Sequence, residues 1–214
     1  MRRYSVAYEY KNSLYLNITN RCPNLCYFCI KTKWNMDYRG FDLKLENEPD
    51  LKEISEEVSR FYGNKKYDEI VFCGYGEPTM RWGIVKEFAN LVRNGKIKNV
   101  NSNERIRINT NGLGNLINKR DITLEMKGII DSLNISLNTA DPKQWIFIMR
   151  PFKEYEEKGF YSVIDFIKKA KNNVEEVVVT AVELKEVDIE AVKKLALDLG
   201  VKFRSRPFLE NEND

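Results

Sequence analysis

The stretch that decides the fold and the chemistry reads Leu14-Tyr15-Leu16-Asn17-Ile18-Thr19-Asn20-Arg21-Cys22-Pro23-Asn24-Leu25-Cys26-Tyr27-Phe28-Cys29. Apolar residues occupy every second position of its first six residues, which is typical of a β-strand with one face against a core. Three cysteines follow at once in a C-x3-C-x2-C run. The stretch therefore predicts a strand that delivers three thiols to one tight loop.

Along the rest of the chain, the spacing of hydrophobic residues switches repeatedly between a period of two residues, typical of strands, and a period of about 3.6 residues, typical of helices. We expect strands at residues 14–19, 69–73, 105–109, 132–138, 177–182 and 201–206, and helices at residues 50–61, 81–93, 121–130, 155–172 and 189–199. Residues 4–10 and 13–18 flank Lys11-Asn12, which predicts a hairpin that adds one antiparallel edge strand. The alternation, without a repeat or a linker, predicts one α/β domain over residues 1–214.

About six βα units are too few to close an eight-stranded barrel, so the sequence predicts an open, partial (β/α)6 barrel with parallel strands. The alternative is a doubly wound sheet, whose strands are apolar on both faces. Residues 14–19 and 132–138 instead alternate apolar and polar side chains. In a barrel, the inward-pointing polar residues would be Asn17, Asn109, Asn134, Ser136 and Asn138. A sheet with one solvent-exposed face explains the alternation equally well.

Composition excludes several classes of function. The 214 residues contain 35 Lys and Arg against 32 Asp and Glu, and the two signs are interspersed, so there is no strong nucleic-acid footprint. No apolar run is long enough to span a membrane and no signal peptide is recognisable, which predicts a cytoplasmic protein. Histidine is absent, which excludes Ser-His and Cys-His dyads and His-ligated zinc. Four cysteines without an export signal favour a metal site over disulfides.

The cysteine run suits an iron-sulfur cubane, because its irons prefer soft sulfur ligands and three clustered thiolates reach three corners. The fourth iron then stays open to a cofactor or a substrate. Structural zinc with Cys73 as fourth ligand is the alternative, but zinc sites usually present paired C-x2-C knuckles or include His. We expect Cys73 to be a buried strand residue rather than a ligand.

With Phe28 before the last cysteine, and with the run placed at the end of a first strand, the sequence resembles the radical S-adenosylmethionine (SAM) superfamily. The resemblance implies a [4Fe-4S] cluster held by Cys22, Cys26 and Cys29, whose open iron chelates the amino and carboxylate groups of SAM. It further implies that one electron from the cluster breaks the bond between sulfur and C5′, and that the resulting 5′-deoxyadenosyl radical abstracts hydrogen from a substrate.

Segments after the other strands extend the resemblance. Gly74-Tyr75-Gly76-Glu77 resembles a GGE segment that contacts the SAM amino group, although Tyr75 stands where a second glycine is usual. Each of these residues also has a purely structural interpretation. Glycine turns are common between strands and helices, a valine such as Val182 is commonly a core residue, and most arginines are solvated at the surface. The cofactor-binding residues that the resemblance implies are Phe28, Gly74, Tyr75, Gly76, Glu77, Asn109, Ser136, Asn138, Arg150 and Val182.

Within the superfamily, residues 14–22, 72–79 and 136–138 resemble the TatD-nuclease-linked radical SAM proteins. The implied partners are a reductant such as flavodoxin or ferredoxin and an unidentified substrate, either a partner protein or a nucleotide. Residues 30–46 are long enough to form a lid, which would favour a small substrate. A glycyl-radical activating enzyme is one alternative, and a non-catalytic zinc or iron-sulfur module is another.

Overall fold

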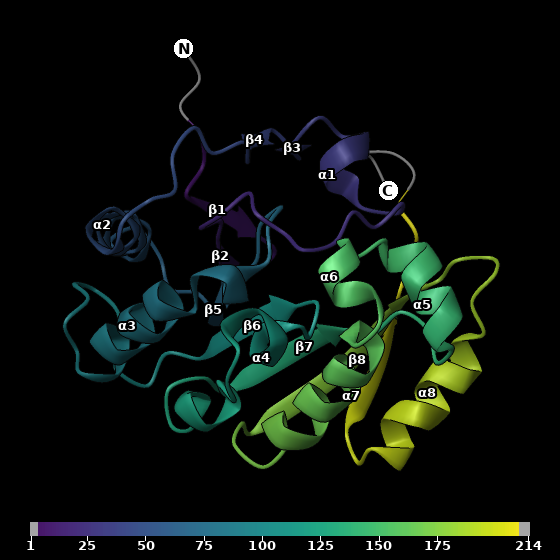
Figure 1. Cartoon of the computed structure of the whole chain (residues 1–214). Helices are drawn as coiled ribbons and strands as arrows, with labels where there is room; N and C mark the ends of the chain where they lie inside the picture. The colour runs from purple at the N-terminus through teal and green to yellow at the C-terminus, as the bar shows by residue number, and fades with distance from the viewer. Residues whose placement is uncertain (1–3, 210–214) are drawn as a thin grey trace.

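The computed structural model describes residues 4–209, which are organised around one seven-stranded sheet (Figure 1). The strands follow the spatial order β1-β2-β5-β6-β7-β8-β9, and β1 and β9 are open edges. The strand bounds are β1 Ala7–Tyr10, β2 Ser13–Leu16, β5 Glu69–Phe72, β6 Ile106–Thr110, β7 Ser132–Ser136, β8 Glu176–Val182 and β9 Lys202–Arg206. β1 pairs antiparallel with β2, which confirms the predicted hairpin, and the other pairs are parallel.

Parallel pairing brings the carboxyl ends of six strands to one edge of the sheet. The register pairs Leu16 with Phe72 at the ends of β2 and β5, and Val182 with Arg206 at the ends of β8 and β9. Loops that leave these ends therefore lie side by side, as they do at the catalytic face of closed α/β barrels.

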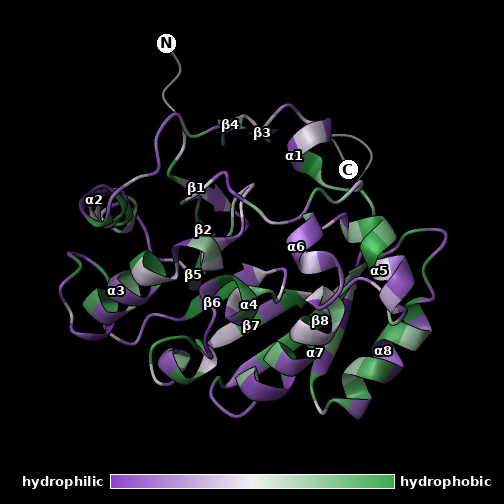
Figure 2. Ribbon diagram, in the orientation of Figure 1, coloured by the Kyte–Doolittle hydropathy of each residue, from purple (hydrophilic) through white to green (hydrophobic). Residues whose placement is uncertain are grey.

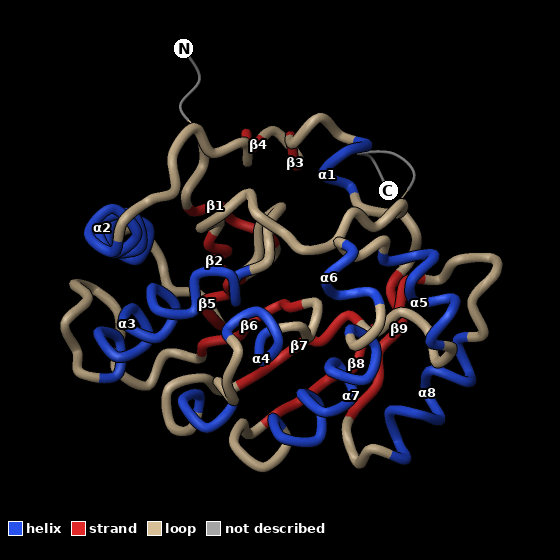
Figure 3. Tube along the Cα trace, in the orientation of Figure 1, coloured by secondary structure: helices blue, strands red, loops and turns tan. Residues whose placement is uncertain are grey.

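Helices cover one face of this sheet (Figure 3). The helix bounds are α1 Ile30–Lys33, α2 Leu51–Tyr62, α3 Trp82–Arg93, α4 Gly114–Asn118, α5 Pro142–Met149, α6 Lys153–Glu156, α7 Gly159–Ala170 and α8 Ile189–Asp198, with 3-10 turns η1 Pro78–Arg81 and η2 Thr123–Met126. Figure 2 shows that α3, α7 and α8 carry both hydrophobic and hydrophilic residues, as expected of helices that face a core on one side. Fully buried side chains from sheet and helices, such as Phe72, Phe88 and Phe166, belong to one core.

The other face of the sheet, which we call the inner face, is polar. Its residues, at every second strand position, include Glu69, Arg107, Asn109, Asn134, Ser136, Arg204 and Arg206. They contact one another across strands: Arg107 pairs with Glu69 at 2.7 Å, and the Arg206 guanidinium donates to Ser136 Oγ at 3.2 Å. The predicted partial barrel is confirmed, because the sheet is not closed, helices cover one of its faces and polar residues line the other.

Asn17 and Asn138 do not line the inner face as predicted. Asn17 is one residue past the end of β2, Asn138 is two residues past the end of β7, and both are fully buried in loop contacts. Asn17 donates to the carbonyls of Ser5 and Leu43 at 3.1 and 2.9 Å. Asn138 has a φ of 67°, so its backbone has already left the strand conformation, and its side-chain oxygen accepts from Val182 N at 3.1 Å.

Two predicted helices also differ. Residues 121–130 form only η2, because the Asp121 carboxylate accepts from Thr123 N at 3.0 Å and so favours a turn, and because Gly128 has a φ of 76°. Residues 155–172 divide into α6 and α7. Helix α5 was not predicted, although Asp141 at its N-cap and Pro142 in its first turn are ordinary helix-start signals.

The predicted lid, residues 30–46, is structured. It contains α1 and a two-stranded ribbon of β3 Asp37–Tyr38 and β4 Phe41–Asp42. Figure 1 shows this ribbon and α1 beyond the β1 end of the sheet. Within residues 4–209, no helix is long and apolar enough to cross a lipid bilayer.

The core between sheet and helices gives a stability prediction. Phe88 of α3 is fully buried and packs edge-on against Phe72 of β5, with ring centroids 5.7 Å apart. Replacing Phe88 by Ala should lower the free energy of unfolding by about 3–5 kcal/mol, because it removes apolar contacts and leaves a cavity. Urea unfolding monitored by circular dichroism measures the change. The matched control is Phe147→Ala, since Phe147 is 61% exposed, and it should cost less than about 1 kcal/mol. Equal costs for the two variants would contradict this packing.

Candidate metal and cofactor site

The three clustered cysteines lie on the loop between β2 and α1, at the carboxyl edge of the sheet. All three are half-buried and none forms a disulfide. Cys26 Sγ lies 3.7 Å from Met149 Sδ of α5, and Asn111 Nδ2 contacts Cys22 Sγ at 3.9 Å. The loop is therefore packed between the ends of β2 and β6 and the α5 helix.

Backbone hydrogen bonds fix this loop to the connection between α5 and α6. Leu25 N donates to the Arg150 carbonyl at 3.0 Å, and Phe152 N donates to the Pro23 carbonyl at 2.8 Å. Arg150 has a φ of 44°, and its guanidinium lies over the Tyr27 ring, 5.6 Å from its centroid. The predicted cofactor residue Arg150 is thus next to the cysteine loop, but it is exposed to solvent.

Burial raises the pKa of each of the three thiols. For Cys22 the value rises to about 12, with a smaller contribution from the Glu77 carboxylate. After burial, the other two thiols are the next causes for Cys26. The three sulfurs are therefore close enough that ionisation of one thiol would hinder ionisation of the others. In the metal-free chain all three thiols are neutral. A metal must displace their protons, so its binding releases protons.

The residues present fit an iron-sulfur cluster. In residues 4–209, no three or more Cys, Asp, Glu or His side chains converge on a point that would hold a single metal ion. A cubane has a different requirement, because each thiolate binds a different iron. Three thiols on one loop, half-buried and free of disulfides, supply the soft donors that such a cluster needs.

Gly74 and Gly76, after β5, pack directly against the cysteine loop. A Cβ at Gly74 would lie 2.1 Å from Asn17 Oδ1, and a Cβ at Gly76 would lie 2.2 Å from the Thr19 carbonyl oxygen. Glu77 N also donates to the Arg21 carbonyl at 2.8 Å. Glycine is required at both positions because no side chain fits between the two loops.

The Glu77 carboxylate is buried and accepts four hydrogen bonds. They come from Thr79 N at 3.0 Å, Thr79 Oγ1 at 2.7 Å, Thr110 Oγ1 at 2.8 Å and Asn111 N at 2.7 Å. Burial raises the pKa of Glu77, and these hydrogen bonds oppose the rise. In this structure the carboxylate holds the turn after β5 to the Thr110-Asn111-Gly112 turn after β6.

Tyr75, the departure from the usual double glycine, is explained by its contacts with residues 30–46. Its ring is buried with Tyr8 and Leu43 in a small second core. Its hydroxyl donates to the Asp37 carbonyl of β3 at 2.5 Å. A glycine here would leave the ribbon of β3 and β4 without this anchor.

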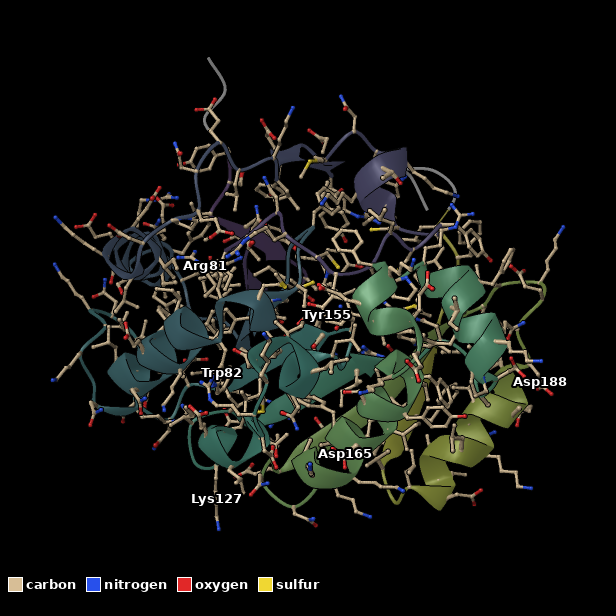
Figure 4. All side chains as sticks on the ribbon, in the orientation of Figure 1. Arg81, Trp82, Lys127, Tyr155, Asp165 and Asp188 are labelled. Carbon is tan, nitrogen blue, oxygen red and sulfur yellow. The ribbon has the colours of Figure 1, made fainter. Side chains whose placement is uncertain are left out.

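A charged cluster around Glu48 fixes the start of the cysteine loop. Arg81, near α2 and α3 in Figure 4, donates to the carbonyls of Ile18 and Pro49 at 2.8 Å each and pairs with Glu48 at 3.3 Å. Arg21 pairs with the same carboxylate at 2.7 Å. The pairing of Arg81 with Glu48 was not predicted from the sequence, because charged residues this far apart carry no local signal of pairing.

The remaining predicted cofactor residues lie near the same edge but in different environments. Ser136 faces inward at the end of β7, and Val182 is buried at the end of β8. Asn109 faces inward from β6, where its side chain accepts from Arg107 Nη1 at 2.5 Å. Phe28 is half-buried beside Tyr27, with centroids 5.8 Å apart. Asn138 is fully buried.

Cys73 follows β5 on the inner face. Burial raises the pKa of its thiol, and the neighbouring Asn109 side chain opposes the rise. Cys73 also makes a small contribution to the raised pKa of Cys29, after burial.

The structure is thus an open, mostly parallel barrel that gathers three free thiols and a glycine turn at its strand ends. The sequence matches the family model of the Radical SAM superfamily over residues 16–199. The chain therefore belongs to the radical SAM superfamily, whose members are enzymes and generally use a [4Fe-4S] cluster and SAM. A search of curated protein sequences gave no match.

Solved structures share the fold. Streptococcus suis SuiB bound to the precursor peptide SuiA superposes with a TM-score of 0.65 at 17% identity, covering 94% of this chain and 40% of SuiB. The hydrogenase maturase HydG of Carboxydothermus hydrogenoformans gives 0.59 at 14% identity, covering 92% of this chain and 44% of HydG. Methylornithine synthase PylB superposes with a TM-score of 0.55 at 15% identity, covering 92% of this chain and 53% of PylB. The chain spans about half the length of these proteins or less.

The contact between the glycine turn and the cysteine loop gives a prediction. Gly76→Ala should force the two loops apart and lower the free energy of unfolding by about 1–3 kcal/mol, because the added methyl meets backbone atoms. It should also reduce the iron and sulfide bound after anaerobic reconstitution. The control is Gly83→Ala in α3, where the methyl meets nothing within 4 Å and helix propensity should stabilise the chain slightly. Full cluster loading in Gly76→Ala would contradict the packing argument.

Proposed function

We propose that this chain is a radical SAM enzyme that binds a [4Fe-4S] cluster through Cys22, Cys26 and Cys29. The observation that carries the proposal is that the loop with the three free thiols packs, through Thr19 and Arg21, against the glycine turn at the carboxyl edge of the barrel. When bound, the cluster would supply one electron for reductive cleavage of SAM, and the 5′-deoxyadenosyl radical would abstract hydrogen from a substrate. Superfamily membership supports this reaction type.

The chain's own residues would bind and orient SAM. Gly74 and Gly76 keep side chains out of the turn, so its backbone would meet the SAM amino group. Glu77 would act by holding this turn against the turn after β6 rather than by contacting SAM. Ser136 would meet the ribose and Val182 the adenine, and the polar residues Asn109 and Asn138 would complete the site.

The aromatic lid supports a small substrate over a large one. Tyr8 is buried, and its ring lies within 6 Å of those of Tyr15, Tyr38 and Phe41. Such a cover would exclude water from a reactive radical. A small molecule or a modified nucleotide is the kind of substrate that such a lid would favour.

A glycyl-radical activating enzyme is the second candidate. Leu25, Phe147 and Phe152 are 60%, 61% and 47% exposed, and their backbones belong to the cysteine loop and the α5–α6 region that holds it. Exposed apolar side chains beside a reactive centre favour docking of a protein partner. Detection of a glycyl radical on a co-purifying partner by electron paramagnetic resonance would select this candidate.

Finer assignments belong to the same proposal. We place the chain among the TatD-nuclease-linked radical SAM proteins on the strength of residues 14–22, 72–79 and 136–138. We further propose one radical SAM core domain over residues 1–214, an oxidoreductase reaction driven by flavodoxin or ferredoxin, and a cytoplasmic location where the four thiols stay reduced.

Substitution of the loop cysteines tests the function. The purified protein is reconstituted anaerobically with iron and sulfide, reduced with dithionite and mixed with SAM, and 5′-deoxyadenosine is measured by chromatography. Cys22→Ala, Cys26→Ala and Cys29→Ala should each abolish the nucleoside, because each removes one of three ligands. Cys73→Ala is the matched control and should retain both the cluster and the cleavage.

The outcomes of this experiment distinguish a radical SAM enzyme from a non-catalytic metal-binding module. Nucleoside formation that persists in any loop-cysteine variant would disprove the ligand assignment. A wild-type protein that binds zinc and leaves SAM intact would support a non-catalytic metal module instead.

A further inference from the structure

The last strand, β9, carries three cations on the inner face: Lys202, Arg204 and Arg206. They differ in their partners. Lys202 pairs with Glu176 at 2.6 Å, close to the amino end of the strand. Arg204 and Arg206, toward the carboxyl edge, form no ion pair with a carboxylate of residues 4–209, whereas Arg105 and Arg107 of the neighbouring sheet region pair with Glu176 and Glu69.

The partners of Arg204 and Arg206 are neutral. Arg206 donates from Nη2 to Ser136 Oγ at 3.2 Å, and its buried Nε has no hydrogen-bond partner in the described chain. Arg204 Nη2 lies 3.1 Å from the Asn134 amide oxygen, in the amide orientation that also accepts from Arg107 at 2.7 Å. Neither guanidinium is neutralised by these contacts.

A cation in this position is costly without an anion. Burial lowers the pKa of Arg206, so its surroundings disfavour the charge that it carries. A buried hydrogen-bond donor without a partner also raises the free energy of the folded state. Both costs fall when an anion with two oxygens meets the guanidinium, because the planar fork of arginine matches carboxylate and phosphate.

The position of Arg206 relates it to the proposed site. Arg206 pairs in register with Val182, and it contacts Ser136, so it lies at the carboxyl edge of the sheet. The thiols of Cys73 and Cys26, when ionised, would raise the pKa of Arg206, so both lie in its neighbourhood. A group bound there would lie at the same edge of the sheet as the cysteine loop.

We propose that Arg206, assisted by Arg204, binds a carboxylate or phosphate group of the substrate, so that the substrate is an organic acid or a phosphorylated compound. This inference rests on the proposed function, because only that function makes the bound molecule a substrate. The anion subsite itself is a property of the folded chain. A nucleotide with a phosphate meets the requirement, and so does an amino acid or a peptide with a free carboxylate.

The test measures binding of inorganic phosphate to the cluster-loaded protein from the 31P line width at constant ionic strength. The wild type should show saturable broadening. Arg206→Gln should weaken binding about tenfold or more, because it removes the charge and the fork. Arg206→Lys keeps the charge and should lose less, and Arg204→Gln should have a smaller effect. The control is Arg105→Gln, which removes the same charge near Glu176 and should bind like the wild type.

Two further arms identify the source of the anion. Saturating SAM should leave phosphate binding in place, and Arg206→Gln should bind SAM within about twofold of the wild type. If SAM displaces phosphate and Arg206→Gln weakens SAM binding equally, the arginines hold the SAM carboxylate and the proposal is wrong. It is also wrong if Arg206→Gln binds phosphate normally, or if phosphate binds only before the cluster is loaded. A protein that binds phosphate through Arg206 but never cleaves SAM would instead disprove the proposed function.

Discussion

The buried carboxylate of Glu77 is the interaction on which the site depends. A charge out of water is tolerated only when hydrogen bonds replace its hydration, and Glu77 receives four from Thr79, Thr110 and Asn111. Its own backbone amide bonds to Arg21 in the cysteine loop. One residue thus fixes the loops that follow β2, β5 and β6. Without that constraint the cysteine loop would still be held to the α5–α6 connection and to the Glu48 cluster, but the turns after β5 and β6 would lose the carboxylate that joins them.

The second constraint is the difference between the two faces of the sheet. The outer face is apolar and packs on helices, whereas the inner face carries charges whose costs are offset by pairing within the face. Glu69 and Arg107 illustrate this, since their side chains are only 17% and 12% exposed and lie 2.7 Å apart. Breaking such a pair is costly because it leaves one uncompensated charge. The inner face is therefore held by pairs across its strands, and Arg204 and Arg206 are the cations of β9 that form no ion pair with a carboxylate among residues 4–209.

The sequence predicted the parts of the fold that depend on local pattern. Alternation placed Asn109, Asn134 and Ser136 on the inner face, and the strand, hairpin and cysteine-loop positions follow from spacing alone. It failed where tertiary contacts decide. The region after Asp121 became a turn through side-chain hydrogen bonds, and Asn138 left its strand to support Val182. The Glu48 cluster could not be predicted, because its partners come from three separate segments.

Tyr75 shows how a departure from a family pattern can carry structural information. In the position of a small residue, it places a hydroxyl against β3 and a ring against Tyr8, so the glycine turn and the lid share one contact. Gly74 and Gly76 on either side leave no room for the turn to move relative to the cysteine loop. Any displacement of the ribbon of β3 and β4 must therefore break the Tyr75 contact or strain the turn. Residues 30–46 are consequently tied to the carboxyl edge of the barrel, rather than attached only through the ends of their own segment.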